Sequence, residues 1–157
     1  MICTTEQYMR DNFIEMKEEA LDGDLCDRWR ILLNSVLSFE ELLEHVLVEE
    51  IAYDYALYVI KRPWSIGEAA IATSAQWSLN YAIFVIKGRW PMGEAAIAKD
   101  AGFAATYAKD FLKMPWSKCP GVDKSTAELA EESIARNKGL LLYYNEFLDE
   151  LKKKETA

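Results

Sequence analysis

The chain has 157 residues, about half of them apolar, and a net charge of −8. This length and composition predict one folded domain with its own core and exclude a disordered chain. No apolar run approaches the roughly 20 residues of a membrane-spanning helix, and the first residues do not resemble a signal peptide. Three distant cysteines, Cys3, Cys26 and Cys119, favour free thiols in a reducing compartment over disulfides.

The first helices are predicted from capping residues. Thr5 can cap a helix over about 6–21, which Gly23 would end, and Asp24 can cap a second helix over about 25–37. Ser38-Phe-Glu-Glu41 has the pattern of a capping box and predicts the start of a long helix over about 39–61.

A tandem repeat with a period of 26 residues follows. The period relates Tyr55, Tyr81 and Tyr107, and it relates Trp64, Trp90 and Trp116 in the same way. The stretch Gly-Glu-Ala-Ala-Ile-Ala occurs identically at 67–72 and at 93–98. A fixed period of this length indicates stacked helical units, each of which buries its apolar face on the next.

Each unit is predicted to contain a long helix, a tight corner and a short helix. Ser74 and Asp100 are good N-caps for long helices over about 75–87 and 101–113. The short helices are expected over about 66–72 and 92–98, with Pro91 in the first position of the second one. No run alternates as a strand would.

The C-terminal part begins with an irregular stretch at 117–124. A degenerate fourth copy is predicted beyond it, because six residues match the preceding copy at a constant offset of 37: Glu131, Ile134, Ala135, Asn137, Gly139 and Tyr144. Ser125-Thr-Ala-Glu128 is a second capping-box pattern.

These elements predict a single all-α domain with a short helical-repeat stack. It divides into acidic N-terminal helices at 1–54, which act as a cap, tandem repeats at 55–116, and an insertion loop with a degenerate capping unit at 117–157. The charge follows a similar division, with −10 over residues 1–54, +4 over 55–124 and −2 over 125–157. These regions are either simply solvated surfaces or fields that steer a charged partner.

The repeated aromatic and charged side chains allow two interpretations each. The tryptophans could form a stacking platform for bases or a peptide groove, but residues fixed at repeat corners usually hold neighbouring units together, so a buried ladder is favoured. Glu68 and Glu94 are expected to pair with lysines between units. Lys61, Lys87 and Lys113, with Arg62 and Arg89 nearby, belong either to that ladder or to a basic edge.

Candidate catalytic and metal sites are weak. His45 shares a helix face with Glu41 and Glu49, but a metal site needs more ligands, so no metal is expected. Cys119 lies in the irregular stretch, where a thiol can be exposed, and nothing nearby supplies a base. No catalytic triad, phosphate loop or zinc spacing occurs, and we expect a non-enzymatic protein without cofactors.

The string Val85-Ile-Lys-Gly-Arg-Trp-Pro-Met-Gly-Glu-Ala-Ala-Ile-Ala98, preceded by Tyr-Ala, resembles tandem repeats in bacteriophage-encoded proteins, most of them without an assigned function. The resemblance covers about residues 52–116. It implies an accessory protein that acts in the bacterial cytoplasm and meets a host factor. It brings no catalytic residues with it.

The sequence therefore favours a protein-binding module that inhibits or modulates a host factor, such as a defence or nucleic-acid enzyme. Acidic mimicry of nucleic-acid phosphates is one mechanism for this. Direct nucleic-acid binding by the basic repeat face and a self-assembling structural repeat are the alternatives, and the net charge opposes the first of these. The target and the oligomeric state stay open. Candidate partner-binding residues are Glu40, Glu41, Glu44, Glu49, Glu50, Lys61, Lys87 and Arg89.

Overall fold

The computed structural model describes residues 49–156, and every regular element in this range is helical. The all-α class predicted from the sequence is therefore confirmed for the described part of the chain. The helices predicted at 6–21 and 25–37, and the start of the one predicted at 39–61, lie outside the described residues.

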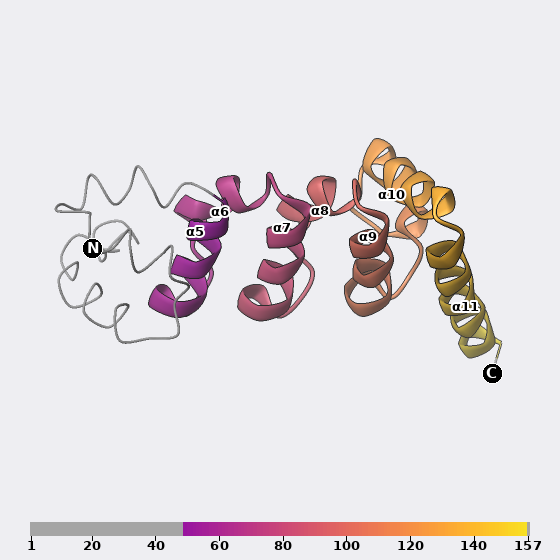
Figure 1. The fold of residues 1–157 in the computed structure, drawn as a ribbon. Helices are drawn as coiled ribbons and strands as arrows, with labels where there is room; N and C mark the ends of the chain where they lie inside the picture. The colour runs from indigo at the N-terminus through magenta and orange to yellow at the C-terminus, as the bar shows by residue number, and fades with distance from the viewer. Residues whose placement is uncertain (1–48, 157) are drawn as a thin grey trace, which may run out of the picture.

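Three helices stand side by side and form the body of the molecule (Figure 1). They are α5 (Glu49–Asp54), α7 (Ala75–Tyr81) and α9 (Ala101–Tyr107). Each continues directly into a wider π-helical turn: η1 (Tyr55–Ile60), η2 (Ala82–Ile86) and η3 (Ala108–Leu112). The joined segments match the long helices expected from the sequence, and they end one residue earlier than expected.

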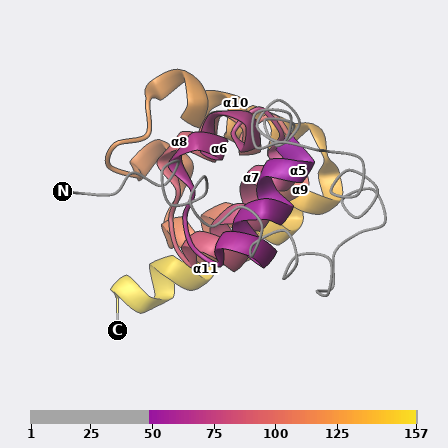
Figure 2. The ribbon, with the colours of Figure 1, turned by 90° about the vertical axis from the view of Figure 1, so that its left-hand side faces the viewer.

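Shorter helices connect these segments along one edge of the row. They are α6 (Ser65–Ile71) and α8 (Pro91–Ile97), and each begins one residue before its predicted start. After the 3-10 turn η4 (Trp116–Lys118), helix α10 (Lys124–Arg136) continues along this edge, and α11 (Lys138–Glu155) ends the row. Viewed along the row, α6, α8 and α10 gather at one side, and α5, α7 and α9 lie behind one another (Figure 2).

Most helix starts follow the expected capping chemistry. The side chains of Ser74 and Asp100 accept hydrogen bonds from the backbone N–H groups of Trp77 and Phe103, at 3.4 and 3.0 Å. Pro91 occupies the first turn of α8, where its missing N–H has no cost. The capping box predicted at Ser125 is wrong: α10 is capped by Asp123, whose carboxylate accepts from the Thr126 N–H.

The long segments end in an unusual backbone conformation. Lys61, Lys87 and Lys113 close the three π-helical turns with φ of 55°, 56° and 57°. The N–H groups of Lys87 and Lys113 donate to the carbonyls of Ala82 and Ala108, five residues back, which is the π-helical pattern. Glycine is the usual residue in this left-handed region, and a side chain there is strained by roughly 1–2 kcal/mol.

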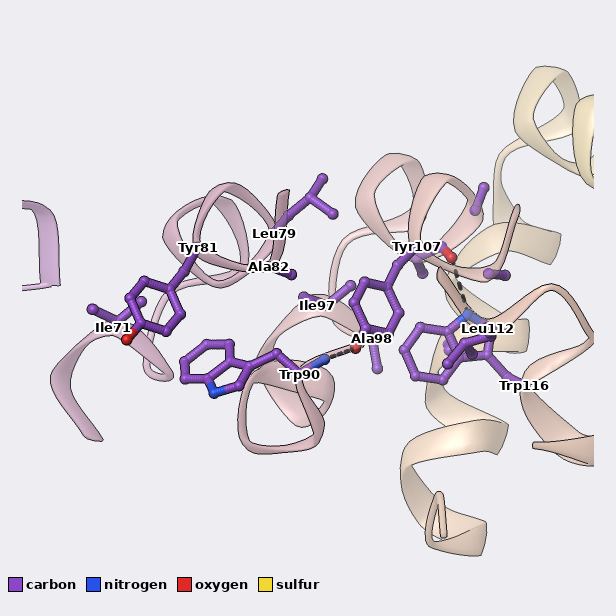
Figure 3. Packing of buried hydrophobic residues seen from close by; sticks show 14 of the residues in the cluster. Ile71, Leu79, Tyr81, Ala82, Trp90, Ile97, Ala98, Tyr107, Leu112 and Trp116 are labelled. Atoms are coloured by element: carbon purple, nitrogen blue, oxygen red, sulfur yellow. Dashed lines mark hydrogen bonds between the residues drawn. The ribbon is translucent and has the colours of Figure 1, made fainter. Parts of the chain in front are cut away.

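A ladder of aromatic side chains forms the core between neighbouring units (Figure 3). Trp64, Trp90 and Trp116 are 0%, 5% and 0% exposed, so the buried interpretation is correct and a stacking platform for bases is excluded. Each indole packs on the tyrosine nine positions before it, with ring centroids 5.0, 4.7 and 5.5 Å apart.

The same tyrosines also connect successive units. The Tyr81 hydroxyl accepts a hydrogen bond from the Trp64 N–H at 2.8 Å, and the Tyr107 hydroxyl accepts one from the Trp90 N–H at 2.7 Å. Burial is the main cause that raises the pKa of both hydroxyls, so they stay protonated and able to donate.

Helices α10 and α11 reproduce parts of this pattern at the offset of 37. The Tyr144 hydroxyl accepts from the Trp116 N–H at 3.4 Å, and Asn137 caps α11 by accepting from the N–H groups of Gly139 and Leu140. Ile134 is fully buried, as is Ile97. Unlike the earlier long segments, α11 contains no π-helical turn and continues to Glu155.

Candidate functional site

The acidic candidates are divided by the limit of the described residues. Glu40, Glu41 and Glu44 lie outside this part of the chain, as does His45. Glu49 and Glu50 lie in the first turn of α5 and are partly buried.

Two of the basic candidates are brought together. Lys61 and Lys87 are exposed and line one groove of about 190 Å³ between the first two long segments. Phe84, which is 52% exposed, lines the same groove. We call Lys61, Lys87 and Phe84 the basic groove. Two ammonium groups beside an aromatic ring can hold a carboxylate or a phosphate together with an apolar group.

The backbone at the two lysines fixes where this groove lies. Because each lysine ends a π-helical turn in the left-handed conformation, its side chain leaves the helix at the corner of the unit. A non-glycine residue in this region is uncommon, and such strain often occurs at functional positions. The recurrence at Lys61, Lys87 and Lys113 makes the three corners alike.

Arg89, the third basic candidate, is engaged within the molecule. Its Nε and Nη2 donate to the two carboxylate oxygens of Glu94 at 2.6 and 3.1 Å, and its Nη1 donates to the Pro120 carbonyl at 2.8 Å. The hydrogen bond to Glu94 is the largest cause that raises the pKa of Arg89. This fork holds the 117–124 stretch against the second unit, and it leaves Arg89 little capacity for a partner.

The expected Lys–Glu ladder does not form at Glu68 and Glu94. Glu68 accepts from the Tyr81 hydroxyl at 3.0 Å, and Glu94 accepts from the Tyr107 hydroxyl at 3.2 Å. Glu94 is only 3% exposed, and its one ion pair is with Arg89. A buried carboxylate needs close donors, and Tyr107 of the next unit and Arg89 supply them to Glu94.

Cys119 is buried, contrary to the expectation of an exposed thiol. Burial is also the main cause that raises the pKa of this thiol, and the nearby Arg89 acts in the opposite direction. A protonated, enclosed thiol is a poor nucleophile, so Cys119 is a packing residue.

Sequence reasoning missed Phe84 as part of the basic groove, although a signal existed. Tyr58 and Phe84 are aromatic residues one repeat period apart, and both are exposed in the structure. These two aromatic residues recur with the period of the repeat, so they could have been considered as a series separate from the tyrosines three residues before them.

The described helices contain no other chemical centre that points to a function. Within residues 49–156 no group of three or more His, Cys, Asp or Glu side chains is arranged to hold a metal ion. None of the helices in the same range has the length and apolar character needed to cross a membrane. Comparisons with protein-family models, curated proteins and solved structures gave no match.

Proposed function

We propose that residues 55–116 are a helical-repeat stack with a 26-residue unit, preceded by an acidic cap at 1–54 and closed by a degenerate unit at 117–157. The recurrence of three features at equivalent positions supports this: the Trp–Tyr ring contact, the hydrogen bond from the tryptophan N–H to the next tyrosine, and the left-handed lysine. Stacks of this kind present extended surfaces to partners.

We infer that the protein is a non-enzymatic module that binds another protein. The observation that carries this inference is the basic groove, where Lys61, Lys87 and Phe84 converge on an exposed surface. The groove offers charge and an aromatic ring to a partner, whereas Arg89 does not line it and is already paired with Glu94. A carboxylate beside an apolar side chain is the partner chemistry that fits the groove.

The proposed partner is a host bacterial protein, and the chain is then a phage accessory protein of the bacterial cytoplasm that inhibits or modulates a defence or nucleic-acid enzyme. The resemblance of the repeats and the charge distribution support this part. The acidic residues at 1–54, which include Glu49 and Glu50, would act as a mimic of nucleic-acid phosphates and occlude a basic site.

The second candidate function is direct binding of nucleic acid by the basic groove. Lysines beside an exposed ring can hold a phosphate and stack a base. The net charge of −8 opposes this candidate, because the whole chain repels a polyanion. The third candidate function is a self-assembling structural repeat.

The test is affinity capture from bacterial lysate with mass spectrometry, using the wild-type chain and two double variants. Lys61→Glu/Lys87→Glu reverses the basic groove, and Lys99→Glu/Lys124→Glu makes the same charge change at two exposed lysines elsewhere. We expect a specific protein to be captured by the wild type and the control and lost with the groove variant. A tight, salt-sensitive complex with bare DNA or RNA that only the groove variant loses would support the second candidate instead.

If the variant Lys61→Glu/Lys87→Glu still captures the same protein, the basic groove is not the binding site. The acidic surface is then tested by Glu40→Gln/Glu41→Gln/Glu44→Gln. If acidic mimicry operates, the association rate with the captured protein falls as salt rises, and the triple variant associates more slowly. An association rate that changes neither with salt nor with the triple substitution would contradict the mimicry mechanism.

A further inference from the structure

A second and larger groove lies at the C-terminal end of the row. Its volume is about 550 Å³, and it separates the corner at 113–118 from helix α11. Its apolar walls come from the corner and from one face of α11, and they are formed by Met114, Pro115, Leu141, Leu148 and Leu151. We call it the terminal groove. The three leucines are partly buried in the structure.

The earlier units show what occupies the corresponding place. Trp116 packs on Tyr107 with ring centroids 5.5 Å apart, and its indole N–H donates to the Ala104 carbonyl at 3.0 Å. Trp90 packs on Tyr81 in the same way, at 4.7 Å. In both units the indole therefore covers the face of the long segment that contains the tyrosine (Figure 3).

The last unit has this face but lacks the indole. The offset of 37 places Leu141 at the position of Ala104 and Tyr144 at the position of Tyr107, and both Leu141 and Tyr144 line the terminal groove. The position of Trp116 corresponds to Lys153. Helix α11 passes through Lys153 without turning back, and this lysine is exposed. The terminal groove thus shares two lining positions with the place that a tryptophan fills in the preceding units.

The charges around the terminal groove indicate what would accompany such a side chain. Lys113, Lys118 and Lys152 line it and are exposed. The carboxylate of Glu131 also lines it, but one of its oxygens accepts from the Ser117 N–H at 3.0 Å. Lys152 is paired with Asp149 at 3.1 Å. The ammonium groups of Lys113 and Lys118, against one partly engaged carboxylate, favour acidic residues in the occupant.

We propose that the terminal groove is a docking site for a segment of a partner protein that carries a tryptophan between acidic residues. The indole takes the place that Trp90 and Trp116 fill in their own units, and the flanking carboxylates contact Lys113 and Lys118. Burial of an aromatic anchor in an apolar pocket with a charged rim is the arrangement of an interface hot spot. This inference concerns a different surface from the basic groove and does not depend on it.

The test is an NMR titration of the full-length, ¹⁵N-labelled chain with the peptide acetyl-Glu-Asp-Trp-Glu-Asp-amide. We expect saturable shift changes at residues 113–118 and along α11. The same peptide with alanine in place of tryptophan should bind about tenfold more weakly or worse, because it lacks the anchor. A peptide with lysines in place of the four acids should also bind more weakly, because it meets the three ammonium groups of the rim.

Two leucines of α11 provide a matched pair of variants. Leu148 lines the terminal groove, whereas Leu142 is 63% exposed and does not line it. Leu148→Glu should weaken binding of the tryptophan peptide by about tenfold or more, and Leu142→Glu should leave it unchanged. Lys118→Glu alters only an exposed rim position, so it tests the groove even if Leu148→Glu fails to fold.

Three results would overturn the proposal. Equal binding of the tryptophan and alanine peptides would show that the indole is not the anchor. Shift changes at the basic groove would show that the peptide binds there and not in the terminal groove. Self-association of the chain that Lys118→Glu abolishes would assign the terminal groove to a second copy. Because the peptide is synthetic, failure to capture a protein from lysate does not affect this result.

Discussion

At the scale of single residues, the tyrosine hydroxyls at 81 and 107 hold neighbouring units together. The Tyr107 hydroxyl accepts from the Trp90 N–H and donates to the Glu94 carboxylate, so one oxygen connects two buried partners. Such a group is hard to replace, because removing it leaves the buried Trp90 N–H without its acceptor and leaves Glu94 with its hydrogen bonds from Arg89 alone.

Tyr107→Phe should therefore destabilise the fold although it removes a single atom. We expect a loss of about 1–3 kcal/mol in the free energy of unfolding, the range for a buried polar group left unsatisfied. Urea denaturation followed by circular dichroism measures it. Tyr58→Phe, at a position that is 39% exposed, is the control and should change little. Equal losses in both variants would show that the Tyr107 hydroxyl is not a connection between units.

Gly93 makes a second prediction at this scale. A Cβ atom at Gly93 would lie 2.6 Å from Cζ3 of Trp90 and 2.9 Å from Cβ of Ser78, because the helix backbone packs directly on the indole. Gly93→Ala should cost about 1–3 kcal/mol through overpacking, more than the helix propensity of alanine returns.

Gly102→Ala is the matched control, since Gly102 also lies in a helix and its Cβ would meet nothing closer than 3.4 Å. This variant should be neutral or slightly more stable, because alanine favours the helix. The melting temperature of Gly93→Ala should therefore fall, and that of Gly102→Ala should stay the same or rise. A Gly93→Ala protein as stable as Gly102→Ala would contradict the close packing of α8 on Trp90.

At the scale of elements, the start of α10 depends on a charged cap. The Asp123 carboxylate accepts from the Ser125 hydroxyl and from the Thr126 backbone N–H, and these hydrogen bonds, the one from Ser125 foremost, hold its pKa below the usual range. Since the pKa is lower in the folded chain than in the unfolded one, the stabilisation is present above the unfolded value of about 4 and is lost as the pH falls below it.

Asp123→Asn removes the negative charge but keeps a side chain that can cap the helix, because asparagine is also a good N-cap. The wild type should be more stable than Asp123→Asn near neutral pH, and the difference should shrink as the pH falls below about 4. Urea denaturation over a pH series measures this, with Asp110→Asn, at an exposed position that caps no helix, as the control. A difference that stays constant across the series would contradict the charged cap.

The sequence predicts these elements well where the signal is local. Ser74, Asp100 and Pro91 are residues with a direct chemical reason to start a helix, and they do so in the structure. The π-helical turns had no such signal, because their strain at Lys87 is visible only in the backbone. Ser125 and Asp123 are both good caps, and only the path of the chain decides between them.

The partners of buried charges were harder to predict than the helices. Spacing alone suggested lysines for Glu94, but the corner geometry places Arg89 and the tyrosine of the next unit against it. The basic groove was partly predicted, since Lys61 and Lys87 repeat in the sequence, whereas Phe84 enters it only through the relative placement of two units. Contacts between units depend on how far each unit is rotated relative to the next, and the repeat period in the sequence does not specify this rotation.

At the scale of the whole molecule, the central proposal is that the chain is built from interchangeable units of 26 residues. Deletion of residues 75–100 removes one such unit and joins Ser74 to Ala101, so that the N-cap at Ser74 precedes α9 instead of α7. Tyr107 would then take the place of Tyr81 and meet Trp64 and Glu68.

The most direct test compares this deletion with the deletion of residues 79–103, which removes one residue fewer and joins Ser78 to Ala104 inside the helix. This junction shifts every following side chain around the helix by about 100°. Circular dichroism during urea denaturation measures both the helix content and the cooperativity. We predict that the chain without 75–100 stays helical and unfolds in one cooperative transition, and that the chain without 79–103 loses this transition. Two deletions that fold equally well, or fail equally, would contradict the repeat-stack account.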